Sequence, residues 1–138
     1  MHNNVILLTR AHLERVAINI ADVSKATYNC GAKPMDATLV EGGPAAYFTR
    51  LPIRRLLEKT RAGDIPTEIS NSAGAFGRNQ IFYHLMDYIA RKKLDIPGGF
   101  IHVPKLPEQV VCTKEPHMSL DLIVKGLEII IGEVSMDL

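Results

Sequence analysis

The chain of 138 residues has no tryptophan, only two cysteines and no long uninterrupted run of apolar residues. Its cysteines, Cys30 and Cys112, lie far apart, which favours free thiols in a reducing compartment over a disulfide scaffold. The apolar stretch from Leu127 to Ile131 contains Glu128 and is too short to cross a bilayer. The first residues include neither a basic leader nor a cleavage-like site. We therefore expect a cytoplasmic protein without a membrane span.

An excess of charge of one sign is also missing, because 16 Lys and Arg residues offset 15 Asp and Glu residues. This balance gives no field that would attract nucleic acid or an anionic membrane. The basic residues Arg54, Arg55, Lys59 and Arg61 are expected to form a solvated helix face. No glycine-rich phosphate loop or dinucleotide fingerprint is present, so we expect no cofactor and no metal. The length suits one core, which predicts a single domain over residues 1–138.

Strand patterns and helix patterns alternate along the chain. The expected strands cover Val5–Leu8, Leu13–Ile20, Thr67–Ser70 and Phe100–Pro104. Helices are expected from a cap at Thr49 to Gly63, from Asn79 onward, and after a cap at Met118-Ser119, with a loop over Asp22–Val40. This alternation predicts an α/β fold, a three-layer sandwich with a mostly parallel sheet.

The periodicity of the helices predicts which residues they bury. In the helix that begins at Asn79, the expected buried side chains are Ile81, Phe82, Leu85 and Ile89, and the expected outer ones are Gln80, His84, Asp87 and Arg91. The last helix is expected to have one broad apolar face of Leu120, Ile123, Val124, Leu127, Ile130 and Ile131.

The stretch from Ile69 to Lys93 organises the chain. A strand here turns through Ala73-Gly74-Ala75 into a helix, so the residues of the turn lie over unpaired backbone N–H groups at the positive end of the helix dipole. An enzyme would place a thiolate at such a turn, because the dipole lowers the pKa of a cysteine. The residue here is Arg78, and a fixed cation at this end of a helix costs about 0.3–1 kcal/mol.

The run SNSAGAFGRNQIFYHLM strongly resembles the nucleophile segment of pyroglutamyl peptidase I, also called pyrrolidone-carboxylate peptidase. In that family a cysteine precedes an asparagine that matches Asn79. The resemblance therefore implies that Arg78 stands at the position of the nucleophilic cysteine. Gly77 likewise replaces a branched apolar residue.

Two further segments resemble the same family. LERVAINIADV resembles the strand with the catalytic glutamate, which implies that role for Glu14, and GGFIHVPKLPEQ resembles the histidine segment, which implies the catalytic histidine at His102. The loop after Asp22 lacks an arginine and a proline that the family has there. Family members are also longer at the amino end, where a strand and a loop help form the pyroglutamate pocket. The expected fold is therefore incomplete at the amino end.

A cysteine peptidase needs a thiolate, a histidine and an acid that orients the histidine. Arginine has no nucleophilic atom and stays protonated, and loss of a triad nucleophile lowers turnover about a million-fold. We therefore expect a non-catalytic relative of peptidases that remove N-terminal pyroglutamate from peptides. The alternative is an active peptidase with a different nucleophile or one completed by another chain. By resemblance, we also expect a homo-oligomer.

Weaker interpretations of individual residues remain open at this point. Without the resemblance, Glu14 reads as a solvated carboxylate at a strand end, and His102 as a buried, satisfied histidine. Arg78 could form an ion pair with Glu14. Ser72 lacks the preceding glycine of a serine-hydrolase elbow. His12 with Glu14 could be part of a metal site, and Cys112 could replace the missing nucleophile.

Overall fold

The computed structural model describes residues 9–23 and 31–138. The chain divides into two compact units. The first unit comprises residues 9–13, Pro52–Ile69 and Ile101–Leu138, and the second comprises the described part of Glu14–Leu51 together with Ser70–Phe100. The expected strand Val5–Leu8 and the residue Cys30 lie outside the described residues. The single-domain organisation over residues 1–138 stays a prediction.

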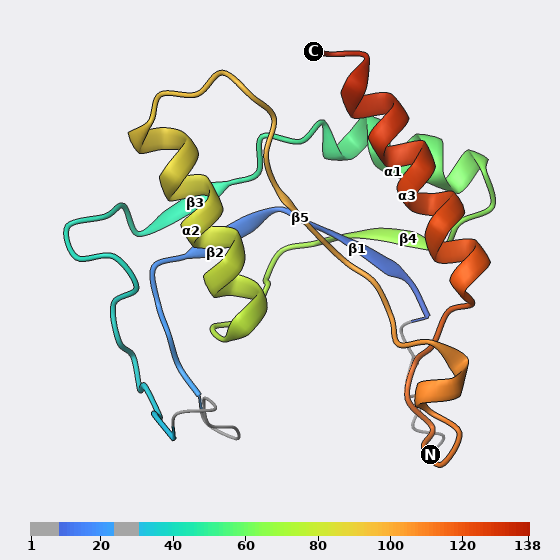
Figure 1. The fold of residues 1–138 in the computed structure, drawn as a ribbon, viewed down its shortest axis with the longest axis horizontal. Coiled ribbons are helices and arrows are strands. Elements are labelled where there is room, and N and C mark those ends of the chain that lie inside the picture. Colours follow the sequence, from blue (N-terminus) through green and yellow to red (C-terminus); the bar gives the residue numbers. More distant parts are fainter. Residues whose placement is uncertain (1–8, 24–30) are drawn as a thin grey trace, which may run out of the picture. The chain divides into compact units, whose positions relative to one another are not determined.

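The first unit contains most residues of a three-stranded sheet and two helices (Figure 1). The sheet has the order β4-β1-β5, formed by β4 (Thr67–Ser70), β1 (Ala11–Glu14) and β5 (Phe100–His102). β1 and β4 are parallel, because the N–H groups of Ala11 and Arg15 donate to the oxygens of Pro66 and Ser70, respectively, so that both strands advance together. β5 runs in the opposite direction (Figure 1). The predicted α/β class is confirmed, with a small mixed sheet.

Helices α1 (Ile53–Ala62) and α3 (Leu120–Ser135) pack against each other in the first unit. Gly126 allows a close approach, since a Cβ atom there would lie 3.1 Å from Ile65 Cγ2. Ser119 caps α3 as predicted, with its hydroxyl accepting from Leu122 N at 3.4 Å. A short 3-10 helix, η1 (Pro107–Gln109), lies between β5 and α3.

The expected cap at Thr49 is wrong, because α1 begins at Ile53 and the Thr49 hydroxyl accepts from Leu51 N instead. The predicted solvated basic face of α1 is also wrong in part. Arg55 pairs with Glu133 and Asp137 of α3, and Lys59 Nζ lies 3.8 Å from Glu133 Oε1. These contacts join residues nearly eighty positions apart, so helical periodicity alone does not reveal them.

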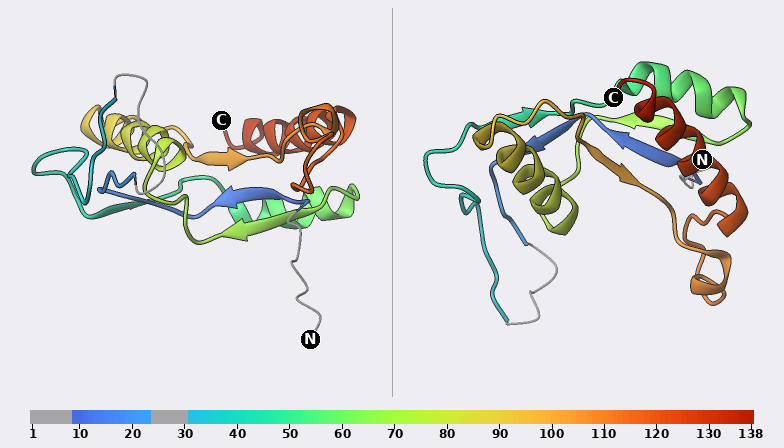
Figure 2. Two further views of the ribbon diagram at one scale, coloured as in Figure 1. Left: turned by 90° about the horizontal axis from the view of Figure 1, so that it is seen from below. Right: turned by 45° about the horizontal axis from the view of Figure 1, so that its top comes forward.

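The second unit is built on a two-stranded antiparallel ribbon and one helix. β2 (Val16–Ile18) pairs with β3 (Ala46–Phe48) in the register Val16↔Phe48, Ala17↔Tyr47 and Ile18↔Ala46. Helix α2 (Gly77–Arg91) packs across both strands (Figure 2). The core consists of buried residues from these elements and the turn before α2: Ala17, Ala73, Phe82, Tyr83, Met86 and Ile89.

The predicted buried face of α2 is wrong in part. Phe82 and Ile89 are buried, but Ile81 is 64% exposed and Leu85 is 39% exposed, whereas the polar residue Asp87 is 2% exposed. Asp87 can be buried because its Oδ1 accepts from the Tyr47 hydroxyl at 3.1 Å and Arg91 Nη2 lies 2.7 Å from its Oδ2. The face of α2 that packs on the ribbon therefore includes Asp87, the partner of Tyr47 on β3, and differs from the face that the apolar pattern predicts.

The predicted apolar face of α3 is also buried only in part. Ile130 is buried, whereas Leu120, Val124 and Ile131 are exposed. Among residues 9–23 and 31–138, no helix is long and apolar enough to cross a membrane.

Candidate active site

The turn between β4 and α2 is held by short polar contacts in the second unit. The Ser70 hydroxyl donates to Ser72 O at 3.0 Å, and the Ser72 hydroxyl accepts from Gly74 N at 3.1 Å. Gly74 has a φ of 75°, a left-handed conformation that favours glycine. The predicted tight turn is therefore confirmed, and the Ser72 hydroxyl serves the backbone of the turn.

Helix α2 begins at Gly77 without a side-chain cap and without an acidic residue in its first turn. Its unpaired N–H groups and its positive dipole end are therefore not offset by a carboxylate of the helix itself. Arg78 occupies the first turn and is exposed. The positive end of the helix dipole would stabilise an anion at this position. It destabilises a cation such as the guanidinium of Arg78.

Asn79 fixes the start of α2 to the ribbon. Its side chain is 1% exposed; Oδ1 accepts from Ile18 N at 2.8 Å, and Nδ2 donates to the oxygens of Ile18 and Ile20 at 2.9 and 3.1 Å. These three hydrogen bonds join the first turn of α2 to the backbone at the end of β2. The sequence indicated Asn79 only through the family resemblance, because nothing local predicts its partners.

Glu14 is the last residue of β1 and is fully buried. Neither of its carboxyl oxygens has a hydrogen-bond partner in the described part of the chain. The interpretation as a solvated strand-end carboxylate is therefore wrong. The hypothesis of an ion pair between Glu14 and Arg78 stays a prediction. Burying a carboxyl group without partners opposes folding by several kcal/mol if the group is charged.

Arg15, next to Glu14, connects the turn to the ribbon. Its Nε donates to Asn71 Oδ1 at 2.8 Å, its N–H donates to Ser70 O at 2.8 Å, and its carbonyl accepts from Thr49 N at 2.8 Å. This residue interrupts the strand predicted over Leu13–Ile20, which is divided into β1 and β2. The contribution of Arg15 to positioning the turn was not predicted from the sequence, because its partners lie far along the chain.

His102 is the last residue of β5 and is half-buried in the first unit. Its ring centroid lies 5.9 Å from that of His12, with an angle of 57° between the planes. His12 Nε2 in turn lies 2.8 Å from Glu68 Oε1, and Arg10 Nη1 lies 3.3 Å from Glu68 Oε2. The carboxylate that accompanies this pair of histidines was not predicted, because β4 and β1 are distant in sequence.

The candidate residues fall in different units, since Glu14 and Arg78 belong to the second and His102 belongs to the first. Cys112 is an exposed free thiol of the first unit. The proposed metal site at His12 and Glu14 gains no support, because residues 9–23 and 31–138 hold no group of three or more His, Cys, Asp or Glu side chains suited to a metal ion.

Comparison with known proteins identifies the family to which this α/β chain belongs. The family model for pyroglutamyl peptidase matches residues 9–137. The chain therefore belongs to the pyroglutamyl peptidase family. It is 47% identical over 122 residues to a pyrrolidone-carboxylate peptidase of Bacillus licheniformis, a match that covers 87% of this chain and 56% of the relative.

Solved structures agree with this assignment. The pyroglutamyl peptidase I of Bacillus amyloliquefaciens aligns with a TM-score of 0.85 and 42% identity, covering 91% of this chain and 59% of that one. A mutant pyrrolidone carboxyl peptidase of the hyperthermophile Pyrococcus furiosus aligns with a TM-score of 0.88 and 34% identity, covering 94% and 64%. The chain thus spans a little over half the length of the curated relatives it matches.

Proposed function

We propose that this chain is a pyroglutamyl-peptidase-like protein without efficient peptidase activity. The observation that carries the proposal is the guanidinium of Arg78 in the first turn of α2, directly before the buried Asn79. In the family pattern this position belongs to the nucleophilic cysteine. A guanidinium cannot attack a carbonyl carbon, so no acyl-enzyme can form there.

The remaining roles also follow from the resemblance and are part of the proposal. His102 would be the histidine that moves the proton, and Glu14 the acid that orients it. Peptides with N-terminal pyroglutamate are the proposed ligand class, since the relatives are named for the removal of pyrrolidone carboxylate.

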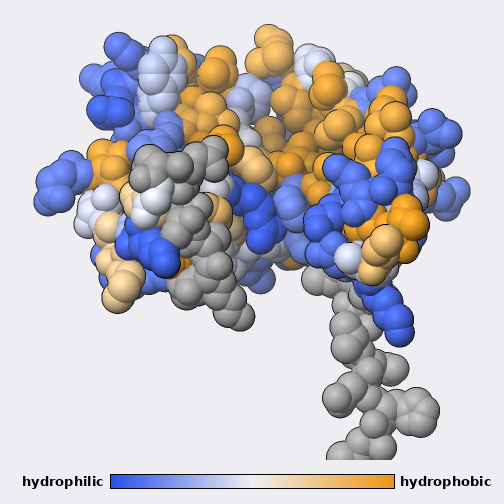
Figure 3. Space-filling view, turned by 60° about the horizontal axis from the view of Figure 1, so that its bottom comes forward, coloured by the Kyte–Doolittle hydropathy of each residue, from blue (hydrophilic) through white to orange (hydrophobic). Residues whose placement is uncertain are grey.

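Two further parts of the proposal concern the whole protein. A homo-oligomer is supported by the exposed apolar side chains of α3, which lie in the right-hand part of the molecule where hydrophobic surface is prominent (Figure 3). A cytoplasmic location is supported by the free, exposed thiol of Cys112, which suits a reducing compartment.

The second candidate is an active peptidase that uses another nucleophile or is completed by another chain. The observation that favours completion is the coverage of only 56% of a close relative's length. The observation that favours another nucleophile is the exposed thiol of Cys112, although it lies in a different unit from Arg78.

One assay separates these candidates. The unmodified chain, Arg78→Cys and the control Arg54→Cys, which adds a cysteine at an exposed position of α1, are incubated with a pyroglutamyl-amide reporter substrate. We expect no cleavage by the unmodified chain or by the control, and cleavage by Arg78→Cys that alkylation abolishes. Cleavage by the unmodified chain would contradict the proposal, and its sensitivity to alkylation would say whether Cys112 is involved. If no variant cleaves, the catalytic loss extends beyond the nucleophile.

A further inference from the structure

Helix α2 exposes an apolar stripe on the face opposite the core. Ile81, Leu85 and Tyr88 are 64%, 39% and 54% exposed. Their spacing of four and three residues places them along one line of the helix. The core of the second unit is formed by the other face, so this stripe plays no part in holding the unit together. Adjacent exposed apolar side chains of this kind mark an interaction surface more often than single ones do.

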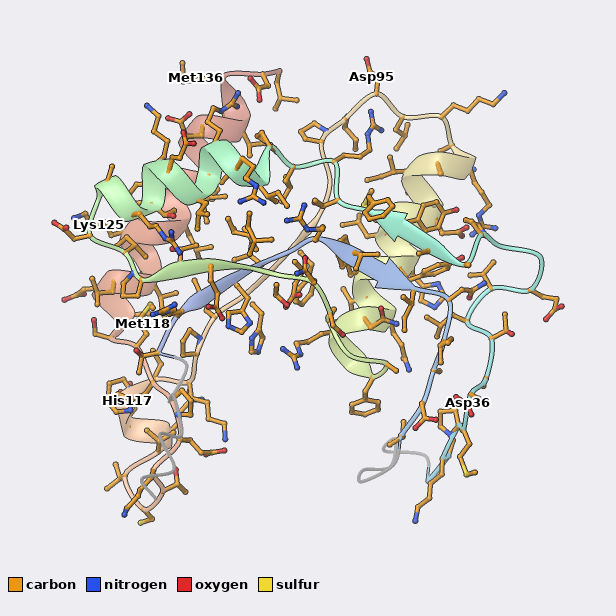
Figure 4. All side chains as sticks on the ribbon, turned by 180° about the vertical axis from the view of Figure 1, so that it is seen from behind. Asp36, Asp95, His117, Met118, Lys125 and Met136 are labelled. Carbon is orange, nitrogen blue, oxygen red and sulfur yellow. The ribbon has the colours of Figure 1, made fainter. Side chains whose placement is uncertain are left out.

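The charges around this stripe are all of one sign. Between Gly77 and Lys93 the only acidic residue is Asp87, which is 2% exposed and paired with Tyr47 and Arg91. Lys92 and Lys93, at the carboxyl end of α2, are exposed. The next exposed acid, Asp95, comes after the helix has ended, in the turn labelled in Figure 4. The outer face of α2 is therefore apolar and cationic.

Helix α3 has the complementary surface. Leu120, Val124 and Ile131 are 56%, 43% and 63% exposed, and with Leu127 they repeat at intervals of four, three and four residues. Its exposed acids are Asp121 and Glu128. Its only cation, Lys125, donates to Gly63 O at 2.9 Å and is thereby turned toward the end of α1 (Figure 4). The outer face of α3 is therefore apolar and acidic.

We propose that the outer face of α2 of one copy binds the outer face of α3 of a second copy. Two antiparallel helices would place the exposed lysines Lys92 and Lys93 beside Asp121, and would oppose the two helix dipoles favourably. The apolar side chains of both helices would then meet between these ends. A contact between the α3 helices of two copies would instead bring two acidic faces together. Lys125, which donates to Gly63 O, would not offset their charge.

The size of the surface sets the expected strength. A 15-residue helix is about 22 Å long at about 1.5 Å per residue, so a single helix pair falls at the low end of specific interfaces. Association should therefore depend on concentration and weaken as salt screens the charges. Because the two surfaces differ, the contact is heterologous and repeats into a ring or an open chain. The inference rests on the homo-oligomer proposed above.

The test is sedimentation equilibrium of the unmodified chain and of two charge variants, Lys92→Glu with Lys93→Glu on α2, and Asp121→Lys with Glu128→Lys on α3. We expect each variant alone to associate at least tenfold more weakly than the unmodified chain. We expect an equimolar mixture of the two variants to associate again, because each supplies the intact surface that the other lacks. Recovery in the mixture also shows that both variants are folded.

Matched controls are Lys33→Glu and Glu41→Lys, which change exposed charges of the second unit outside α2 and should leave association unchanged. A monomeric unmodified chain at all concentrations would overturn both the homo-oligomer and this contact. An oligomer that resists the α2 variant but not the α3 variant would overturn only the contact, in favour of α3 with itself. An oligomer that resists both variants would place the interface elsewhere and overturn the contact as well.

Discussion

Two carboxyl groups of the second unit are buried, with opposite outcomes. Near the carboxyl end, Asp87 has the Tyr47 hydroxyl at 3.1 Å and Arg91 Nη2 at 2.7 Å. In the same unit, Glu14 is equally buried and has no hydrogen-bond partner among the described residues. A partnered buried charge supports the fold, whereas an unpartnered one opposes it. The difference indicates that the contacts of Asp87 stabilise the fold and that the burial of Glu14 does not.

The largest expected effect tests the stabilising side of this comparison. Asp87→Ala should lower the free energy of unfolding by about 2 kcal/mol, because it removes the acceptor of a half-buried hydroxyl and the partner of Arg91. Urea denaturation followed by circular dichroism measures this. Asp95→Ala, at an exposed position that pairs with Arg50, is the control and should change stability by less than about 0.5 kcal/mol. Equal losses of stability in Asp87→Ala and Asp95→Ala would show that the buried contacts of Asp87 add no more than an exposed ion pair does.

A change of opposite sign is expected at the other carboxyl group. Glu14→Met keeps a similar volume and removes a buried polar group without partners, so it should raise the free energy of unfolding by about 1–2 kcal/mol. The same denaturation experiment applies, with Glu41→Met at an exposed position as the control. A loss of stability in Glu14→Met would mean that the carboxyl group has a partner in solution, and the contrast with Asp87 would fail.

The smallest expected effect concerns pH. Burial, followed by the hydrogen bond to Asp87 and the charge of that carboxylate, raises the pKa of Tyr47 above 10. The folded state therefore holds this proton more tightly than the unfolded chain, and the resulting stability is present below about pH 10 and lost as pH rises through the folded pKa. Tyr47→Phe should make the decline in stability between pH 9 and 11 shallower. Denaturation at both pH values measures it, and an unchanged slope would disprove the linkage.

Tyr83 provides an internal comparison for that experiment. Its pKa is also raised, first by burial and then by the charge of Asp87, but its hydroxyl donates to Pro44 O at 2.7 Å and not to the carboxylate. Tyr83→Phe should therefore also reduce the slope above pH 10, while leaving intact the hydrogen bond that the Tyr47 hydroxyl donates to Asp87.

Much of the fold follows from local sequence. The strand Thr67–Ser70, the cap at Ser119 and the end of α1 at Gly63 were predicted correctly, because alternation, a hydroxyl acceptor and a terminal glycine act within a few residues. The orientation of α2 was not, since Asp87 is buried by Tyr47, forty positions away. The burial of Glu14 escaped prediction for the same reason: its surroundings come from distant segments.

In the candidate site, too, local sequence motifs indicated some residues, whereas contacts between distant segments were not predicted. A resemblance in short motifs was enough to select Glu14, Arg78 and His102, whose roles stay predictions. It could not indicate that Arg15 connects to Asn71, or that Glu68 accompanies His12 beside His102. Each of these contacts joins strands or turns that only the folded chain brings together.

The anchoring of α2 through Asn79 has a consequence for how such a protein can arise. The three hydrogen bonds at the start of the helix belong to the asparagine, and the residue before it is exposed. Two arginine codons differ from the two cysteine codons by a single nucleotide. An exchange between cysteine and arginine at position 78 can thus occur in one mutational step, and it leaves the anchoring hydrogen bonds of Asn79 untouched.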